Sequence, residues 1–324
     1  MPEAPHVAVT GAAGYIGSRL VADLTERHPN WTVTALDDFY LGEVEQIGDV
    51  VVRDVDVRDR DALEAAIAGA DAVCHLAAVS GVDDCAENAD HAYEVNVQGT
   101  DNVAWFCRKT GAAMLFPFSM AVVGDPHDFP ITTDHPRDPL NWYGRTKYIG
   151  ERAVEGFAAG AFPAVQFMIS NLYGEHRIGD RRVSKGTVIN FFVNRALSGE
   201  TLTVYEPGTQ SRNFIHVADV ARAFRLGVER ALERSAAGET GTWKYAIASD
   251  EDPSVRQVAD LVADAVERET GDRPLVELVE NPRGDETLVS DFDVDTTAAR
   301  TDLDWRPERT VRESVDDLVA RRLD

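Results

Sequence analysis

The feature that most constrains the fold is a glycine-rich turn between a short apolar run and a helical pattern. Residues 6–10 (HVAVT) are β-branched and mostly apolar, as in a buried parallel strand. The segment TGAAGYIG follows at 10–17, and apolar residues then recur at helical spacing up to residue 24. This order of strand, glycine turn and helix predicts a nucleotide-binding unit, with a ligand-free tight turn as the alternative.

Each glycine of the turn has a distinct expected role. Gly11 permits the tight bend, Gly14 lets the backbone approach a pyrophosphate, and Gly17 allows the helix to pack closely on the strand. Tyr15 and Ile16 complete the loop and are counted with it as cofactor-binding residues. The pyrophosphate would lie at the positive N-terminus of the helix.

A carboxylate follows the second predicted strand, residues 31–36. Asp37 stands twenty residues after Gly17, where a carboxylate can accept both ribose hydroxyls of an adenosine. The same charge would repel a 2′-phosphate, so NAD is favoured over NADP. Asp38 could instead be a turn residue, and we prefer Asp37 because it directly follows the apolar run.

The third predicted strand, residues 50–57, carries the next candidates at its end. Asp56 could hydrogen-bond the adenine amino group or cap a turn, and both readings stay open. Val57 beside it is also assigned to the cofactor site.

The fourth predicted strand, residues 71–76, ends in small residues. Leu76, Ala77 and Ala78 keep this sheet edge narrow enough for a flat cofactor to cross it. His75 lies within the apolar run, which favours a packed core histidine over an acid or base.

A helix is expected over residues 92–109, and it contains the unfavourable sequence NVQGT at 96–100. An asparagine inside a helix suggests a packing or polar role, so Asn96 is included among the candidate cofactor residues.

Tyr143 and Lys147 lie four residues apart at the start of a later helix, and therefore on the same face. A neighbouring cation lowers the pKa of a phenol from about 10, so that it can exchange a proton with an alcohol. Most such pairs merely decorate solvated helix faces. Ser119 adds weight, because it stands at the end of the predicted strand 114–118, where a hydroxyl can position an alcohol.

Strands and helices alternate up to a sixth predicted strand at residues 164–169, which predicts an α/β fold with a Rossmann-type doubly wound parallel sheet. The regular alternation of strands and helices ends after about residue 171. We expect an NAD-binding domain at 1–170 and a smaller C-terminal α/β substrate lobe at 171–324, with some segments of the latter returning to the first domain.

The charge excludes one class of partner. The chain has 56 acidic against 32 basic residues, a net charge of −24, and only four lysines. The acids are spread along the chain, as in proteins of salt-loving archaea, where high salt screens self-repulsion. This composition argues against nucleic acid as a partner.

Membrane segments, leader sequences and cysteines indicate the compartment of a protein and its redox or metal chemistry. No apolar run is long enough to cross a membrane and no leader precedes the first strand, so a cytoplasmic protein is expected. The three cysteines are too few and too scattered for a disulfide framework or a thiolate metal site, and no metal is predicted.

Nine segments in the same order resemble those of the extended short-chain dehydrogenase/reductase family, especially its nucleotide-sugar epimerase branch. They are TGAAGYIG at 10–17, LDD at 36–38, DVRD at 56–59, HLAA at 75–78, NVQGT at 96–100, FSMAVVG at 118–124, YGRTK at 143–147, NLYG at 171–174 and RNFIHVADVARA at 212–223. The resemblance covers nearly the whole chain.

The resemblance implies roles for individual residues. Tyr143 would be the general base and acid, Lys147 would lower its pKa and hold the nicotinamide ribose, and Ser119 would bond the reacting sugar hydroxyl. Asn171 and Arg212 fall where the family binds sugar and diphosphate. A guanidinium suits that anion.

The implied reaction is the UDP-glucose/UDP-galactose type of 4-epimerisation. The sugar is oxidised transiently at C4 to a 4-keto sugar, which rotates and takes the hydride back on its other face. The resemblance also implies a homodimer formed by helices 92–109 and 143–158, which would expose Trp105, Phe106, Ile149 and Phe157. The alternative is that these side chains pack on the sheet.

Departures from the family pattern narrow the reaction and leave the sugar open. Met120-Ala121 stand where dehydratases carry Asp-Glu and decarboxylases carry Glu, which argues against both reactions. Arg283, in NPRGD at 281–285, is a candidate second diphosphate ligand, although the same segment is similar to UDP-sulfoquinovose synthase. A sugar dehydrogenase and a non-catalytic NAD-binding regulator are the remaining alternatives. The diphosphate clamp disfavours the former, and the Ser119/Tyr143/Lys147 set disfavours the latter.

Overall fold

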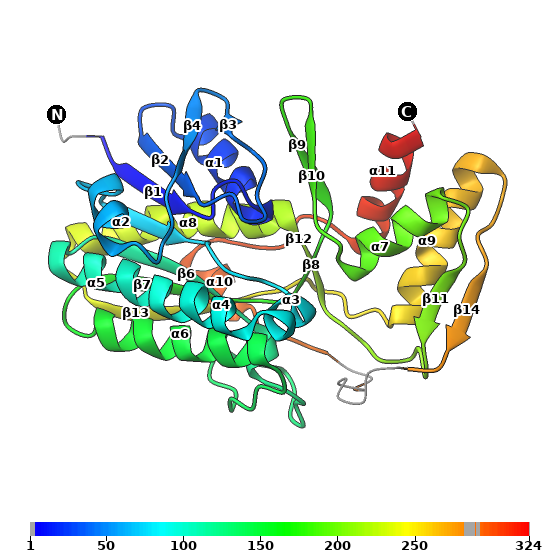
Figure 1. Cartoon of the computed structure of the whole chain (residues 1–324). Coiled ribbons are helices and arrows are strands. Elements are labelled where there is room, and N and C mark those ends of the chain that lie inside the picture. The colour runs from blue at the N-terminus through cyan, green and yellow to red at the C-terminus, as the bar shows by residue number, and fades with distance from the viewer. Residues whose placement is uncertain (1–3, 282–288, 290–291, 324) are drawn as a thin grey trace.

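The main layer of the molecule is an eight-stranded sheet with the order β13-β7-β6-β5-β1-β2-β4-β3 (Figure 1). The computed structural model describes residues 4–281, 289 and 292–323. The strands of this sheet are β1 (His6–Thr10), β2 (Thr32–Asp37), β3 (Gln46–Ile47), β4 (Val50–Asp54), β5 (Ala72–His75), β6 (Ala113–Ser119), β7 (Pro163–Ile169) and β13 (Gly241–Ile247). Only the β3–β4 pairing within it is antiparallel, so the predicted Rossmann-type α/β fold is confirmed.

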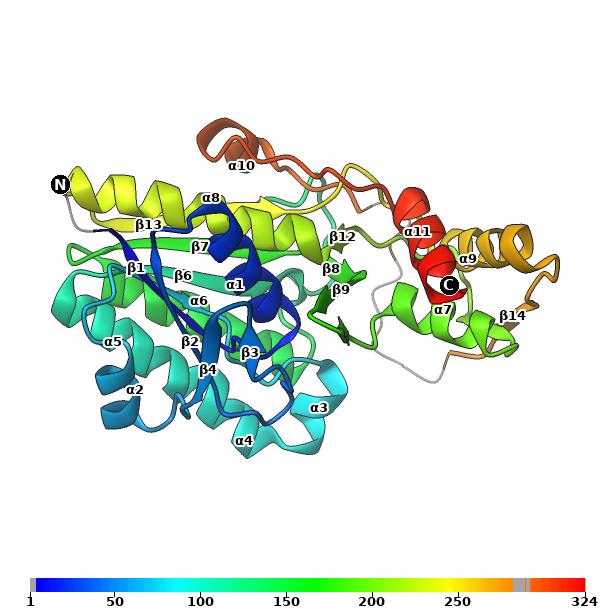
Figure 2. The ribbon, with the colours of Figure 1, turned by 90° about the horizontal axis from the view of Figure 1, so that it is seen from above.

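Helices cover both faces of the sheet, as Figure 2 shows from above. On one face α1 (Tyr15–Arg27) packs against α8 (Val217–Ala236). On the other face lie α2 (Arg60–Ala66), α5 (Thr100–Thr110) and α6 (Trp142–Ala158). Because both faces are covered, the central strands are mostly apolar, and every residue of β7 is buried, including Gln166.

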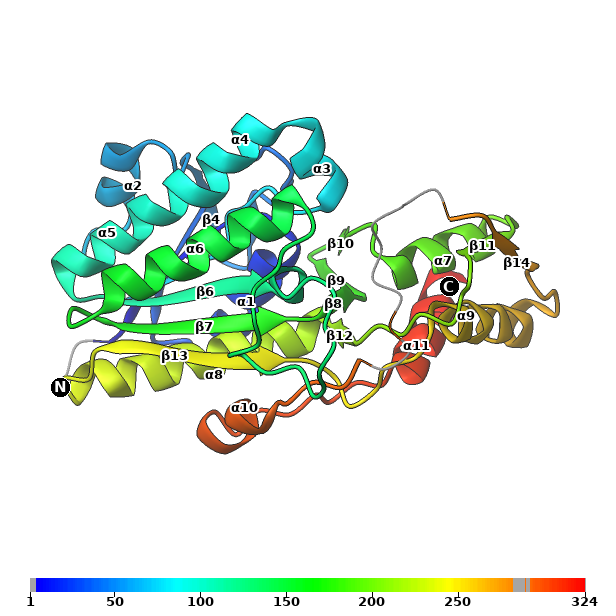
Figure 3. The same ribbon diagram turned by 90° about the horizontal axis from the view of Figure 1, so that it is seen from below.

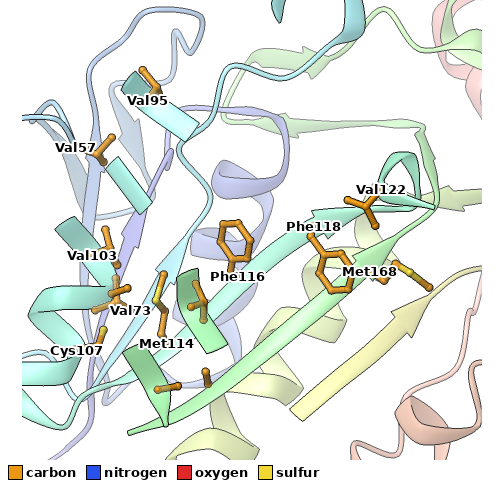
Figure 4. Close-up of a cluster of buried hydrophobic side chains, with 14 of the residues drawn as sticks. Val57, Val73, Val95, Val103, Cys107, Met114, Phe116, Phe118, Val122 and Met168 are labelled. Atoms are coloured by element: carbon orange, nitrogen blue, oxygen red, sulfur yellow. The ribbon is translucent and has the colours of Figure 1, made fainter. Parts of the chain in front are cut away.

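The hydrophobic core beneath α5 and α6 includes side chains of β6, the strand that ends at Ser119. Figure 4 shows Phe116 and Phe118 of β6 with Met168 of β7 within this cluster. Close packing of such large side chains fixes the position of the strand end.

The segment expected as one helix over 92–109 is interrupted. α4 (Ala89–Tyr93) runs into a π-helical turn, η1 (Glu94–Gly99), before α5 begins. π-turns occur frequently at functional sites. This one contains Asn96, the residue that is unfavourable in a regular helix.

The exposure predicted for the apolar side chains of these helices is wrong at Phe106, and Phe157 is only partly exposed because it packs against the same core. Phe106 is only 4% exposed and belongs to the core under α5, because it lies on the sheet-facing side of the helix. Trp105 and Ile149 are each 38% exposed.

A separate, smaller core lies beyond the sheet. It is formed by α7 (Val188–Leu197), α9 (Val255–Thr270), α11 (Val311–Leu323) and the parallel pair β11 (Leu202–Tyr205) and β14 (Val276–Val279). Figure 3 shows this lobe at the end of the sheet opposite the N-terminus. Among the described residues, no helix combines the length and the apolar character needed to cross a membrane.

Short strands connect the two parts. β8 (Asn171–Tyr173) pairs with β12 (Phe214–His216), and β9 (Glu175–Ile178) forms a hairpin with β10 (Arg181–Ser184). The hairpin stands between the sheet and the smaller lobe in Figure 1. α8 and β13 lie with the large sheet although they follow residue 170. The domain boundary near 170 stays a prediction, with these two as returning segments.

Candidate functional site

The site lies where the strand order changes direction. β1 and β5 are neighbours in the sheet, and the chain leaves them toward opposite sides, to β2 and to β6. The carboxyl ends of two such strands border a crevice, which is the usual ligand site of an open α/β sheet. Here a cavity of about 740 Å³ occupies this edge, and residues from both parts of the chain line it.

The glycine turn lies against the loop that follows β5. Gly11 has a φ of +71°, and a Cβ added to it would lie 2.5 Å from the backbone nitrogen of Ala77. A Cβ on Gly17 would collide with the carbonyl oxygen of Gly11. The three glycines, Tyr15 and Ile16 all line the cavity, so the predicted loop is brought to the predicted place.

Asp37 is the last residue of β2 and lines the same cavity. Its Oδ2 accepts a hydrogen bond from the Ala13 nitrogen at 2.9 Å, and its Oδ1 accepts one from Phe39 at 2.9 Å. Burial raises the pKa of this carboxyl. Asp38 also lines the cavity but is exposed, so Asp37 is the more firmly positioned of the two.

Asp56 and Val57 separate in the structure. β4 ends at Asp54, earlier than predicted, and Val57 lines the cavity whereas Asp56 is not among the lining residues. The Asp56 carboxylate pairs with Arg58 at 2.7 Å, which lowers its pKa. The turn role is therefore the one that this geometry supports.

The small residues after β5 form the next part of the wall, because Leu76, Ala77 and Ala78 all line the cavity. His75 does not. Its ring bonds Thr10 Oγ1 at 2.8 Å and Thr100 Oγ1 at 3.0 Å, and burial lowers its pKa to about 3. It is a core histidine, as expected.

Asn96 holds the cavity wall in place by hydrogen bonds without lining the cavity itself. Its Oδ1 accepts from the Val79 nitrogen at 2.8 Å, while its Nδ2 donates to the Val79 carbonyl at 3.0 Å and to Thr146 Oγ1 at 3.0 Å. It does not line the cavity, but it ties the loop after β5 to the helix that carries Tyr143 and Lys147.

Ser119, Tyr143 and Lys147 meet at one end of the cavity wall. The Asn141 side chain caps α6 by accepting from Gly144 at 2.9 Å, which fixes the turn that holds Tyr143. The Ser119 side chain lies near the Tyr143 hydroxyl and favours its ionised form.

The expected lowering of the phenol pKa by Lys147 is not seen in the chain alone. Burial raises the pKa of Tyr143 to about 12, only partly offset by the nearby Ser119 side chain. Desolvation disfavours the phenolate more strongly than these surroundings favour it.

Lys147 is a buried cation with no hydrogen-bond acceptor among the residues that the structure describes. Its side chain is 6% exposed, its Nζ lies 5.3 Å from the Phe116 ring, and burial lowers its pKa to about 8. No hydrogen bond from this Nζ is found among the described residues. A ligand with hydroxyl oxygens would satisfy it, so glycine loop, Asp37 and Lys147 together fit NAD with its two riboses.

The opposite wall comes from the hairpin and was missed by sequence reasoning. Arg181, Arg182 and Lys185 line the cavity, and Lys185 Nζ donates to Ser80 Oγ at 2.6 Å and to the Ser80 carbonyl at 2.9 Å. No motif marks them. The available signal was the rarity of lysine in this chain.

The predicted substrate ligands are not brought to this cavity. Asn171 Nδ2 donates to the Asn213 carbonyl at 3.0 Å and Arg212 Nη1 to the Ser211 carbonyl at 2.8 Å, and neither residue lines the cavity. Arg283 lies outside the described residues. Their roles stay predictions.

Comparisons with known proteins agree with this geometry. A putative UDP-glucose 4-epimerase of Methanocaldococcus jannaschii is 28% identical, over 97% of each chain. The UDP-glucose 4-epimerase of Corynebacterium glutamicum is 30% identical, over 96% of this chain and 94% of its own. The crystal structure of Thermus thermophilus UDP-glucose 4-epimerase in complex with NAD superposes with a TM-score of 0.81 at 25% identity, over 97% of this chain and 98% of the other.

Residues 7–243 match the family described as the NAD dependent epimerase/dehydratase family. This match spans more than half of the chain and confirms both the resemblance to extended short-chain dehydrogenases and the NAD prediction. The chain therefore belongs to the NAD dependent epimerase/dehydratase family.

Proposed function

We propose that the protein is a 4-epimerase of UDP-hexoses that interconverts sugars of gluco and galacto configuration. The observation that carries the proposal is that Ser119, Tyr143 and Lys147 line the cavity that the glycine loop also lines, while Lys147 makes no side-chain hydrogen bond among the described residues.

The three side chains have separate tasks at the C4 hydroxyl. Tyr143 takes its proton and later returns it, Ser119 orients the oxygen, and Lys147 donates to ribose hydroxyls and favours the phenolate. When bound, NAD supplies reversible oxidation of C4 and a positive charge that lowers the phenol pKa further.

The residues after Ser119 support epimerisation over the family's other reactions. They form a short 3-10 helix, Met120–Val122, in which Met120 is buried and packs in the core. Neither of the two positions that follow Ser119 can supply an acid or a carboxylate to the sugar.

The test is a panel of UDP-sugars incubated with the protein and catalytic amounts of NAD, followed by separation of the products. We expect the C4 epimer to form without net accumulation of NADH. Stoichiometric NADH with a free aldose would instead establish the sugar dehydrogenase alternative.

Tyr143→Phe should abolish turnover while NAD binding persists. Tyr148→Phe is the matched control, since Tyr148 lies on the same helix but does not line the cavity. Unchanged activity of the Tyr143→Phe variant would overturn the role assigned to its hydroxyl.

We also infer a homodimer through α5 and α6, which lie side by side in Figure 3 and expose Trp105 and Ile149. Trp105→Asp should shift the mass measured by light scattering from dimer to monomer. A monomeric wild-type protein would contradict the inference.

A further inference from the structure

Lys185 differs from the other lysines of the chain. Lys109 pairs with Glu64 at 2.5 Å, and Lys244 pairs with the buried Glu151 at 2.6 Å. Lys147 and Lys185 are the two of the four that line the cavity, and they come from opposite walls. A chain of net charge −24 thus places half of its lysines at one site.

The Lys185 ammonium is incompletely compensated. It is partly buried, and both of its hydrogen bonds go to neutral oxygens of Ser80. No ion pair of Lys185 occurs among the described residues. Asp84 favours its charge from a distance, but burial outweighs this and lowers the pKa of Lys185.

The other cations of the same wall have carboxylates nearby. Arg181 pairs with Glu43 at 3.2 Å, and Arg182 lies 3.9 Å from Glu175, which Arg322 bonds more closely at 2.7 Å. Among the three, Lys185 is the partly buried one and makes no ion pair with the described residues, so it is the best placed to bind an anion inside the cavity.

A chain of hydrogen bonds links Lys185 to the part of the cavity wall that carries Lys147. Ser80 directly follows Val79, which Asn96 holds, and Asn96 also bonds Thr146, the neighbour of Lys147. The charge of Lys185 acts on Lys147 as well, since it contributes to the lowered pKa of that residue. A pyrophosphate at the glycine loop would lie against a different part of the wall, so that anion does not account for Lys185.

We propose that Lys185, with the hydroxyl of Ser80, binds a carboxylate on the sugar, so that the preferred substrate is a UDP-hexuronic acid rather than a neutral UDP-hexose. The inference rests on the proposed function, because it assumes a UDP-sugar whose ring lies beside Tyr143. Lys185 thereby sets specificity, while Ser119, Tyr143 and Lys147 perform the reaction on either kind of sugar.

The test is calorimetric binding of three ligands to NAD-loaded protein in a Tyr143→Phe background, which prevents turnover. The ligands are UDP, UDP-glucose and UDP-glucuronic acid. We expect UDP-glucuronic acid to bind about 10- to 100-fold more tightly than UDP-glucose, as for a charge-assisted hydrogen bond in a partly buried site. Lys185→Met should remove that preference, and Lys185→Arg should retain part of it.

Lys109→Met is the control, because Lys109 is an exposed lysine far from the cavity lining. Equal binding of the two sugars by the parent protein would overturn the proposal. Equal weakening of all three ligands by Lys185→Met would overturn it as well, since Lys185 would then bind the diphosphate. Lys185→Gln, compared by circular dichroism, separates loss of specificity from loss of folding.

The two proposals fail in different measurements. If no UDP-sugar is epimerised, the binding preference still tests Lys185. If epimerisation occurs with neutral sugars and Lys185→Met leaves the preference unchanged, the specificity inference fails while the proposed function stands.

Discussion

The two walls of the cavity differ in the size and charge of the groups that line them. The wall at the ends of β1, β2 and β5 consists of backbone and short side chains, with Gly11 against Ala77 and Asp37 held by two backbone N–H groups. The wall from the β9–β10 hairpin presents long cationic side chains, among them Lys185. The first wall can recognise a ligand by its shape at close approach and by the carboxylate of Asp37, and the second wall by its positive charge.

Among substitutions in the first wall, Gly11→Ala should weaken NAD binding most. The substitution combines a positive φ with a Cβ 2.5 Å from the Ala77 nitrogen, and we expect about a 100-fold loss of NAD affinity, measured by calorimetry. Gly69→Ala is the matched control, because Gly69 has a φ of +78° but nothing within 4 Å of its Cβ. Similar losses in both variants would contradict the close-approach argument.

Lys147 supplies a positive charge beside the first wall, so its removal sharpens the comparison. We expect Lys147→Met to weaken NAD binding about tenfold. Burial places the pKa of Lys147 near 8 in the chain alone, so its ammonium is present below that pH and lost above it. NAD affinity should therefore be flat below about pH 7 and fall above pH 8, by at most about tenfold in total, the loss expected for Lys147→Met.

The same titration with Lys147→Met provides the control. A flat profile is expected for the variant, because its site has lost the titrating group. An identical decline in variant and wild type would assign the pH dependence to another residue.

Asp37 and Asp38 test whether carboxylate position matters on this wall. We expect Asp37→Ala to reduce the preference for NAD over NADP roughly tenfold, since it removes the group predicted to accept the ribose hydroxyls. Asp38→Ala should change the preference less than about twofold, because Asp38 is exposed and its Oδ1 accepts only from Tyr40 at 3.1 Å. The larger loss in Asp38→Ala would reverse the assignment.

Higher salt should stabilise the fold but weaken the binding of acidic ligands at the wall formed by the β9–β10 hairpin. Raising KCl from about 0.1 M to about 2 M screens the self-repulsion of a net charge of −24 and should raise the unfolding temperature by several degrees. The same change should weaken the binding of acidic ligands at Lys185. A protein that is equally stable in both salts would contradict the expected adaptation to salt.

The first wall was predictable from sequence because its constraints are local. Gly11, Gly14 and Gly17 have meaning through their spacing alone, and Asp37 through its distance from them. Ser119 and Tyr143 were found in the same way, as residues that follow a strand and open a helix. The buried state of Tyr143 was not predictable, because desolvation depends on every element packed around it.

The second wall could not be predicted, because its residues become neighbours of the site only through long-range pairing. Lys185 reaches Ser80 across 105 positions of the chain. Asn171 and Arg212 were assigned from family position, and the structure shows hydrogen bonds from both to nearby carbonyls, so their ligand roles stay predictions. Asn96 was recognised as unusual, but its bond to Val79 follows from the π-turn that no propensity indicates.

The glycine-loop helix also touches the strands that carry the second wall. The Tyr15 hydroxyl donates to the Gly174 carbonyl at 2.6 Å, and Ser18 bonds the His176 ring at 2.9 Å. A shift of the β9–β10 hairpin on substrate binding would therefore be felt by the loop that holds the cofactor. Because such coupling is reciprocal, a bound UDP-sugar should tighten NAD binding by the same factor by which NAD tightens the binding of the UDP-sugar.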